Sequence, residues 1–306
     1  VYAMKKVLVI GLSGKSLFFE LPYFPRIGET ITSNYFHVEY GGKGFNQALA
    51  IARMGLKCDF ITKLGKDDIA EKCVKILNDY DITSHIIYSA NKSSAVATIL
   101  TTINGENEVI LHPGASDEIL FEEIIKYEEV FKNTDYVLLQ QEIPLLTLEK
   151  IIDLASKYKT KIILNPAPAR YKLSDLYLNK IYLLTPNENE FRDMFEIPTF
   201  IKTTQLGEYY CQKYKNSSLK IIVTLGEKGA LIIENDSFYF IDAEKVVAVD
   251  STGAGDVFNG ILTAMLAKNY SLFDAVKLAN KGAALSVTKK YVIDAIPTFD
   301  NLITKK

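Results

Sequence analysis

The chain has 306 residues, of which 48% are hydrophobic and 24% are charged, and its formal net charge is −2. This length suits one large α/β domain, or one such domain with an appendage. The near-neutral charge argues against a dedicated nucleic-acid binder, which would carry a basic surplus. No run reaches the roughly 18 apolar residues that a membrane helix needs, and the first residues lack a signal-peptide pattern. We therefore expect a cytoplasmic protein that binds neither membrane nor nucleic acid.

The cysteines and histidines do not form a metal site or a disulfide framework in the sequence pattern. Cys58, Cys73 and Cys211 are widely spaced, odd in number and without a CxxC pair, which excludes a zinc knot by spacing. The three histidines also lack metal-ligand spacing. A reducing compartment is the expected location.

Apolar runs alternate with segments of helical periodicity along most of the chain. Buried strands are predicted at Val7–Ile10, Asp59–Thr62, Tyr136–Leu139, Lys161–Leu164, Ile181–Leu184 and Ile221–Thr224. Helices are predicted between many of them, at Gly44–Met54, Ile69–Tyr80, Thr147–Tyr158, Gln205–Tyr214 and Ala275–Thr288. This alternation is typical of a doubly wound, mainly parallel α/β sheet flanked by helices. Ligands of such sheets bind beyond the carboxyl ends of the strands.

Two stretches break this alternation. Glu29–Glu39 is predicted to be extended, and Ala95–Leu111 predicts two strands around the Asn104-Gly105 turn, a strong hairpin signal. Neither stretch is followed by a crossover helix. We therefore expect a single domain over residues 1–306, with a small separate β-sheet formed by about 12–40 and 93–113. Such a sheet would serve as a lid over the active site or pair along its edges in a dimer.

The segment from Val249 to Gly260 carries the most chemical information. The small-residue turn Gly253-Ala254-Gly255-Asp256 leads into an apolar helix predicted from about 256 to 267. The first N–H groups of a helix lack intrahelical partners and attract anions such as phosphate, and an acid beside them can take a proton from a hydroxyl. From these residues alone, an N-cap role for Asp256 explains the pattern equally well. The turn does not match GxxxxGK[ST], so it is not a Walker-type P-loop.

Two further glycine clusters are candidate ligand-binding turns. In Gly41-Gly42-Lys43-Gly44-Phe45-Asn46, the side chains of Lys43 and Asn46 precede or begin an amphipathic helix and would converge with backbone N–H groups on a polar ligand. Thr224-Leu225-Gly226-Glu227-Lys228-Gly229 follows a buried strand, where a nucleotide binds in this architecture. The alternatives are a plain helix start in the first cluster and a hairpin turn into Ala230–Ile233 in the second.

Taken together, these pieces resemble the ribokinase-like, or PfkB, carbohydrate kinase family over nearly the whole chain, and most closely its ribokinase branch. The first family signature appears as Gly41 to Ala48 and the second as Asp250 to Gly260. Between them stand the motifs Gln141-Glu142-Ile143-Pro144, Asn165-Pro166-Ala167-Pro168-Ala169-Arg170 and Thr185-Pro186-Asn187-Glu188-Asn189-Glu190. The resemblance implies an ATP-dependent kinase with Mg²⁺, with K⁺ as a possible activator and a homodimer formed through the small sheet.

The resemblance also implies a role for each matched position. Asp256 would be the catalytic base, beside an anion hole for the transferred phosphoryl group formed by Gly253, Ala254 and Gly255. The acceptor would be bound by Gly14, Ser16, Gly42, Lys43, Asn46, Glu142 and Asp256, and ATP by Asn187, Thr224, Gly226, Gly229 and Asn280. Glu190 would act on Mg²⁺ indirectly. A monovalent cation would be bound by Asp250, Thr252, Ser286, Lys289, Tyr291 and Ala295.

The acceptor end departs from the family pattern. The family's Asn-x-Asp falls on Gly14-Lys15-Ser16, so the two-oxygen fork of an ionised Asp is missing, a loss on the order of 1 to 3 kcal/mol per contact. We expect the acceptor to be ribose or a related sugar. The missing fork favours a modified acceptor such as another pentose or hexose, a nucleoside or a sugar phosphate, whereas ribose itself would be bound by Ser16 through water. Lys15 beside this site favours a sugar phosphate, whereas a nucleoside would need an apolar shelf from residues such as Phe18, Phe36, Tyr40, Phe45 and Ile110.

Two other classes of protein are disfavoured. A sugar-binding regulator that has lost catalysis would lack the base or the anion hole, and both are present. A dinucleotide-dependent dehydrogenase would need G-x-G-x-x-G after the first strand, whereas this chain has Gly11-Leu12-Ser13-Gly14 there.

Overall fold

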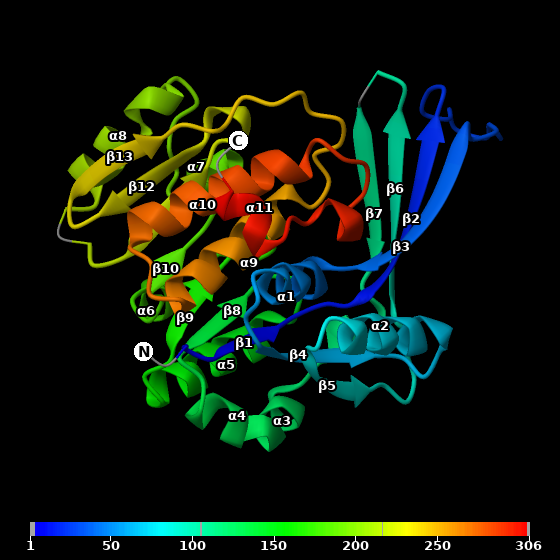
Figure 1. The fold of residues 1–306 in the computed structure, drawn as a ribbon, viewed down its shortest axis with the longest axis horizontal. Coiled ribbons are helices and arrows are strands. Elements are labelled where there is room, and N and C mark those ends of the chain that lie inside the picture. The colour runs from blue at the N-terminus through cyan, green and yellow to red at the C-terminus, as the bar shows by residue number, and fades with distance from the viewer. Residues whose placement is uncertain (1–3, 105, 216, 305–306) are drawn as a thin grey trace.

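The computed structural model describes residues 4–104, 106–215 and 217–304, arranged as Figure 1 shows. One large sheet has the strand order β13-β12-β11-β10-β9-β8-β1-β4-β5. Neighbouring strands from β11 to β5 are parallel, whereas β12 and β13 extend the β11 edge in antiparallel fashion. The predicted doubly wound, mainly parallel sheet is confirmed. Its strands are β1 (Val7–Ile10), β4 (Cys58–Leu64), β5 (Thr83–Tyr88), β8 (Tyr136–Leu139), β9 (Lys161–Leu164), β10 (Leu183–Leu184), β11 (Lys220–Thr224), β12 (Ala230–Glu234) and β13 (Ser237–Ile241).

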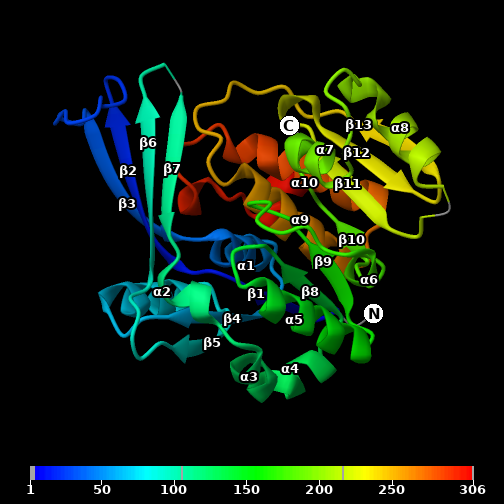
Figure 2. The ribbon, with the colours of Figure 1, turned by 180° about the vertical axis from the view of Figure 1, so that it is seen from behind.

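Helices cover both faces of the large sheet, because its strands carry apolar side chains on both sides. Val7 and Val9 point into one core, and Leu8 and Ile10 into the other. The first core lies under the helices nearest the viewer in Figure 1, which are α1 (Lys43–Arg53), α2 (Asp68–Asp79), α9 (Ala254–Ala267), α10 (Leu272–Ser286) and α11 (Phe299–Ile303). The second lies under the helices that Figure 2 shows from behind, which are α3 (Phe121–Ile124), α4 (Glu128–Lys132), α5 (Leu145–Lys157), α6 (Asp175–Leu178), α7 (Glu188–Met194) and α8 (Leu206–Lys213). Short 3₁₀ helices in the connections are η1 (Gly114–Glu118), η2 (Ile125–Tyr127), η3 (Thr203–Gln205), η4 (Gly226–Lys228) and η5 (Ile293–Ala295).

A second sheet, called here the small sheet, stands to one side of the large one (Figures 1 and 2). Its order is β3-β2-β6-β7, from the strands β2 (Gly14–Leu21), β3 (Tyr35–Gly41), β6 (Ala95–Thr102) and β7 (Asn107–His112). The expected small separate sheet is confirmed. Gly105 of the predicted hairpin turn lies outside the described residues.

Three local predictions differ from the structure. The predicted extended stretch becomes a strand only at Tyr35, because residues 29–34 have no neighbouring strand to pair with. The strand predicted at Ile181–Leu184 is reduced to its last two residues, since the N–H of Ile181 bonds to the Leu178 carbonyl of the preceding turn. Helix α9 begins at Ala254 and its N-cap is Gly253 in the left-handed conformation, with φ of +75°. Asp256 therefore lies within the first turn and is not the N-cap.

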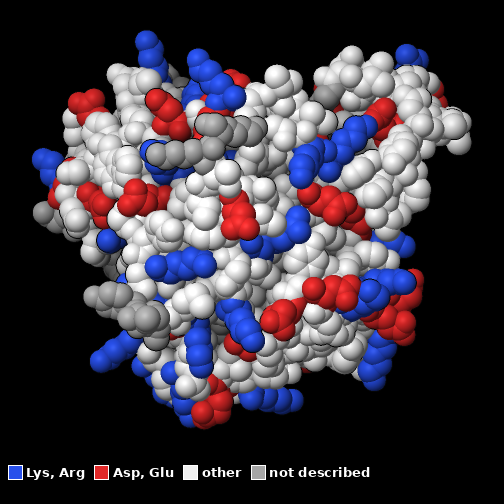
Figure 3. Space-filling view, in the orientation of Figure 1, with Lys and Arg blue, Asp and Glu red and all other residues white. Residues whose placement is uncertain are grey.

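Within the described ranges, none of the helices combines the length and the apolar character that crossing a membrane requires. On the face shown in Figure 3, acidic and basic side chains are interspersed.

Candidate active site

Two neighbouring cavities lie where the parallel strands end and the small sheet begins. The small-sheet cavity, of about 200 Å³, is bordered by Gly14, Ser16, Asn46 and Glu142. The strand-end cavity, of about 170 Å³, is bordered by residues that follow the strands and by the turn that opens α9, among them Asn165, Thr185, Asn187, Glu190, Thr224, Ala254 and Gly255. Lys43, Gly253 and Asp256 border both cavities. The structure thus brings the predicted base to the point where two ligands would meet.

The carboxylate of Asp256 is buried and held by two amide donors from α1. Asn46 Nδ2 donates to Oδ2 at 2.9 Å, and Gln47 Nε2 donates to Oδ1 at 3.0 Å. The two helices approach closely because Gly260 of α9 has no side chain; a Cβ there would overlap Ala50 and lie 2.7 Å from the Gln47 carbonyl oxygen. Burial raises the pKa of Asp256, although the charge of Lys43 and the two amide donors act against this. A raised pKa makes the carboxylate a better proton acceptor.

A chain of buried polar side chains orients Gln47 and extends to the ends of three strands. Gln140, directly after β8, donates to Gln47 Oε1 at 2.7 Å, and Gln47 Nε2 also donates to Asn165 Oδ1, directly after β9, at 3.2 Å. The network continues through Thr185, after β10, to Asn259 of α9 at 2.5 Å, whose amide donates to the Gly255 carbonyl. No role was predicted for Gln47, Gln140, Thr185 or Asn259 from the sequence. The available signal was a polar residue directly after each of three buried apolar runs, at Gln140, Asn165 and Thr185.

Lys43 lies among three carboxyl groups. Its backbone N–H donates to Glu142 Oε2 at 3.0 Å. Burial opposes its charge, but the carboxyl groups of Asp256, Glu142 and Glu190 prevail and raise the pKa of Lys43. Burial raises the pKa of Glu142 to about 7, with Lys43 opposing that shift. Lys43 therefore supplies a positive charge between the two cavities.

The turn that opens α9 borders both cavities. The N–H of Ala254 donates to the Ser251 carbonyl at 3.2 Å, and that of Val257 donates to Gly253 at 2.9 Å. The N–H groups of Gly255 and Asp256 lie between them in the first turn of the helix, where intrahelical partners do not exist. Of the three predicted anion-hole residues, only Ala254 therefore has an N–H with a hydrogen-bond partner in the described part of the chain, which leaves those of Gly253 and Gly255 for an anion.

The phosphate-binding residues predicted after the strands also border the strand-end cavity. Asn187 caps α7: its Oδ1 accepts from the Glu190 N–H at 2.9 Å, and Glu190 Oε2 accepts from the Asn187 N–H at 2.8 Å. Thr224, at the end of β11, pairs with Asn187 in an isolated parallel bridge. Burial raises the pKa of Glu190, although the Asn187 N–H and Lys43 oppose it. In the described part of the chain no three His, Cys, Asp or Glu side chains cluster as metal ligands, so a Mg²⁺ ion here would depend on phosphate oxygens for most of its ligands.

A further cavity, of about 310 Å³, lies between the end of β13 and α10. Asn280 borders it and donates to the Ile241 carbonyl at 3.2 Å. Gly226 and Gly229 shape the turn after β11, both with positive φ, and a Cβ on Gly229 would overlap the Ile241 carbonyl. The two glycines thus set the path of the backbone in this turn, whereas Asn280 places a polar side chain at the border of the cavity.

One wall of the small-sheet cavity is apolar, with Leu12, Ala97, Ile99, Val109 and Leu111. Facing it, Asn46 Oδ1 is buried without a hydrogen-bond partner among the described residues. A Cβ on Gly41 would lie 3.1 Å from this oxygen and 3.5 Å from Ser16 Oγ, so both polar atoms flank the same glycine. They are available for a hydroxyl group of a ligand.

The model of the pfkB family carbohydrate kinases matches residues 4–299. The chain belongs to this family of carbohydrate kinases. The ribokinase of Haemophilus influenzae is 34% identical to it over 300 residues, which cover 96% of each chain. The deoxyribokinase of Salmonella typhi is 32% identical over 297 residues, again 96% of each chain. The crystal structure of ribokinase from Thermotoga maritima matches with a TM-score of 0.85 and 29% identity, covering 97% of this chain and 98% of the other.

In this carbohydrate kinase, the residues predicted for a monovalent cation lie on two adjacent segments. Val287 O accepts from the N–H groups of Val249 and Asp250. Asp250 Oδ1 accepts from the Thr252 N–H and Oδ2 from the Tyr291 N–H, each at 2.9 Å. Ser286 Oγ donates to the Ala283 carbonyl of its own helix, and Lys289 Nζ to the Asp294 carbonyl; Ala295 N–H donates to Val292 O. The side chains of Asp250, Ser286 and Lys289 thus form hydrogen bonds within the protein.

Neither Lys15, considered for a sugar phosphate, nor the apolar shelf considered for a nucleoside is placed as the alternative acceptors would require. Successive side chains of a strand point to opposite faces. Lys15, although it borders the cavity, is paired with Tyr40 and Val96, which pack against the first core; its side chain is directed to that face and away from Ser16. The shelf residues Phe18, Phe36, Tyr40, Phe45 and Ile110 do not border the small-sheet cavity.

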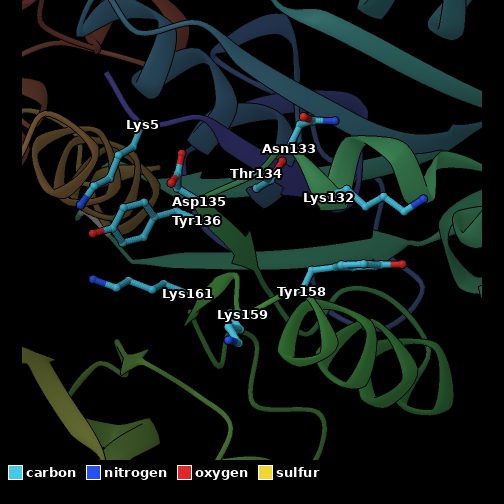
Figure 4. Close-up of a pocket in the computed structure, with 9 residues that line it drawn as sticks. All are labelled: Lys5, Lys132, Asn133, Thr134, Asp135, Tyr136, Tyr158, Lys159 and Lys161. Atoms are coloured by element: carbon cyan, nitrogen blue, oxygen red, sulfur yellow. The ribbon is translucent and has the colours of Figure 1, made fainter. Parts of the chain in front are cut away.

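A larger cavity, of about 330 Å³, lies at the amino ends of the central strands β1, β8 and β9, opposite to the two cavities described above. Figure 4 shows that its lysines do not converge: Lys5 and Lys161 extend to one side with Tyr136, and Lys132 to the other. It holds one carboxylate, Asp135, whose Oδ2 accepts from the Lys6 N–H. Its position, opposite to where ligands of parallel sheets bind, separates it from the catalytic chemistry.

Proposed function

We propose that this carbohydrate kinase transfers the γ-phosphoryl group of ATP to a hydroxyl of ribose or a related sugar, with Asp256 as the base. The observation that carries the proposal is the position of Asp256. Its buried carboxylate borders both cavities, beside Lys43 and the N–H groups that open α9. The sugar would occupy the small-sheet cavity, and the phosphates of ATP the strand-end cavity.

The reaction follows from this arrangement. A sugar hydroxyl gives its proton to Asp256 as its oxygen forms a bond to the γ-phosphorus, and the bond to the β–γ bridging oxygen breaks, so that ADP leaves. Lys43 and the N–H of Gly255 stabilise the charge on the phosphoryl oxygens, which is the main task of a phosphoryl-transfer site. Mg²⁺ would neutralise phosphate charge when bound, and Glu190, which borders the strand-end cavity, would act on it indirectly. The nucleoside end of ATP would lie in the cavity beside Asn280, past the turn of Gly226 and Gly229.

The acceptor is proposed to be a monosaccharide. The cavity of about 200 Å³ is smaller than the roughly 300–1,000 Å³ typical of sites for larger ligands. Relatives named ribokinase and deoxyribokinase support a pentose. Gly42, Lys43, Asn46 and Glu142 would bind its hydroxyls from one side, and Gly14 and Ser16 from the small sheet. A nucleoside or a sugar phosphate is less well supported, because no aromatic shelf residue named above borders the cavity and the Lys15 side chain is directed away.

The remaining proposals concern the small sheet and the cation. Residues of about 12–40 and 93–113 would act as a lid inserted in a single domain of residues 1–306. The face of the small sheet away from the cavity exposes Phe36 and Ile110, which suits a homodimer formed through this sheet in the cytoplasm. K⁺ would be held by carbonyl groups along the segments of Asp250 and Tyr291.

An ADP-release screen tests the proposed function. Purified protein with ATP and Mg²⁺ is offered ribose, deoxyribose, other pentoses, hexoses, nucleosides and sugar phosphates, with and without K⁺. We expect saturable ADP release with a pentose and a higher rate with K⁺. Turnover confined to a nucleoside or a sugar phosphate would contradict the proposed acceptor, and ADP release with none of them would contradict the activity.

A further inference from the structure

A segment near the C-terminus, Lys290 to Val292, packs against the small sheet on the same side as the catalytic cavities. The ring of Tyr291 stacks on His37 with centroids 3.7 Å apart and meets Phe18 edge-on at 5.3 Å. Lys290 lies 3.6 Å from a carboxylate oxygen of Glu20. In Figure 1 this red segment runs close to the small sheet, just before α11. Side-chain contacts thus join the segment to β2 and β3.

Glu39 of β3 makes the most specific of these contacts. Its Oε2 accepts from the backbone N–H of Val292 at 3.0 Å, and its side chain is only 10% exposed. Without this donor, the buried carboxylate would keep only the ring nitrogen of His37, 3.7 Å from Oε1, against the cost of its desolvation. Glu39 is directly opposite Ser16 in the register of β2 and β3, so the two side chains share a face of the small sheet. Position 16 has a serine where the family pattern has an aspartate, and the acidic Glu39 lies directly across from it on the neighbouring strand.

The same segment contacts the turn that opens α9. The Tyr291 N–H donates to Asp250, whose other oxygen accepts from the Thr252 N–H. The side chain of Val292 packs so closely on Gly253 that a Cβ there would lie 2.8 Å from it. Gly253 is the N-cap of α9 and borders both cavities. Contacts thus run without interruption from Glu39 through Val292 to the predicted anion hole.

We propose that Glu39 is a positioning residue for phosphoryl transfer, which holds Val292 and through it the Gly253 turn in the geometry that receives the phosphoryl group. The proposal rests on the proposed function. Glu39 does not border either cavity, and its nearest donor is a backbone N–H, so its effect passes through Val292 and not through a contact with the sugar. Because its neighbour in the register, Ser16, does border the sugar cavity, Glu39 also links the sugar wall to the phosphate turn.

Kinetics of three variants separate this role from a general effect on folding. Glu39→Ala removes the acceptor for the Val292 N–H, and we expect kcat to fall about tenfold, or about 1.4 kcal/mol, with the KM for ATP within about twofold. Glu39→Gln retains an oxygen that accepts the same hydrogen bond, so it should restore kcat to within about threefold of the unaltered enzyme. Glu29→Ala is the matched control: Glu29 lies in the connection between β2 and β3 and bonds to Tyr23 and Arg26, so its loss should leave kcat unchanged.

Hydrogen exchange gives a readout that does not depend on turnover. In the protein without ligands, Glu39→Ala should speed exchange at Val292 and Thr252 at least fivefold, while exchange in the helix interior of α5 stays unchanged. Equal exchange at these amides, or a kcat equal to that of the unaltered enzyme, would overturn the positioning role. If ribose and ATP give no turnover with the unaltered chain but exchange still changes as expected, the proposed function fails while the structural link stands.

Discussion

The two cavities of this carbohydrate kinase are built on different principles. The strand-end cavity is assembled from residues that directly follow parallel strands and from the first turn of α9, so its polar groups are fixed by backbone geometry and by a buried side-chain network. The small-sheet cavity combines a polar floor with an apolar wall from the small sheet. The strand-end cavity is therefore tied to the fold, whereas the small-sheet cavity can change through side chains such as Ser16 without altering the large sheet. The departure from the family pattern at Gly14 and Ser16 lies at this second cavity, although Gly42, Lys43 and Asn46 of the first family signature border it too.

The largest effect on kcat is expected from substitution of the proposed base, Asp256. Asp256→Asn removes the proton acceptor where both cavities meet, and general-base catalysis contributes about 10²–10⁴-fold. We expect kcat to fall about 10³-fold, measured by ADP release with ribose. Thermal unfolding and ATP binding should stay close to those of the unaltered enzyme. Turnover within tenfold of normal would show that another group takes the proton.

The packing of α1 on α9 offers the next largest effect. Gly260→Ala places a methyl group against Ala50 and the Gln47 carbonyl, and such overpacking costs about 1–3 kcal/mol. Because α1 carries both amide donors to Asp256, the shift should also lower kcat. Urea unfolding and kinetics measure the two effects. Gly55→Ala, at an open position with positive φ after α1, is the control that strains the backbone away from this contact; a comparable fall in kcat there would contradict the packing explanation.

The small-sheet cavity is expected to respond to pH through Glu142. Burial raises the pKa of Glu142 to about 7 from an ordinary value of 4.5. Between these two values the folded protein keeps a proton that the unfolded chain has released, so this group makes the free energy of unfolding decrease as pH rises from about 4.5 to about 7. Glu142→Gln should remove that part of the decrease, as measured by urea unfolding across this range.

The same group should also shape the affinity for sugar. An ionised Glu142 is a stronger hydrogen-bond acceptor than a protonated one, so the KM for ribose should decrease as pH rises through about 7. In Glu142→Gln this change should be absent. An unchanged pH profile of KM in the variant would place the titrating group elsewhere.

The smallest effect concerns the pair formed by positions 16 and 39. Ser16→Asp restores the family's acid but places it opposite the buried Glu39, and like charges directly opposite in a sheet are destabilising, with cross-strand pairs contributing about 0.2–1 kcal/mol. We expect the substitution to lower the free energy of unfolding by about 1 kcal/mol in the Glu39 background and by less in Glu39→Gln. A double-mutant cycle by urea unfolding measures the coupling. Equal costs in both backgrounds would show that the two positions are independent.

The sequence by itself determined the strand and helix pattern, the family and the candidate base, because apolar periodicity and closely spaced glycine motifs are local properties. The alternation around Val7–Ile10 and Tyr136–Leu139 predicted strands with the observed bounds. The start of α9 was predicted two residues late, because the acidic residue of the turn was taken as its first residue, whereas the N-cap is Gly253 in the left-handed conformation.

Only the tertiary structure decided how distant side chains meet. The donors to Asp256 come from α1, more than 200 residues earlier, and the network through Gln140, Asn165 and Thr185 exists because three parallel strands end at one edge. Because successive side chains of β2 point to opposite faces, the Lys15 side chain is directed away from the small-sheet cavity. The register of β2 and β3 places Glu39 opposite Ser16. Strand pairing and helix packing set these relations, and no local pattern in the sequence encodes them.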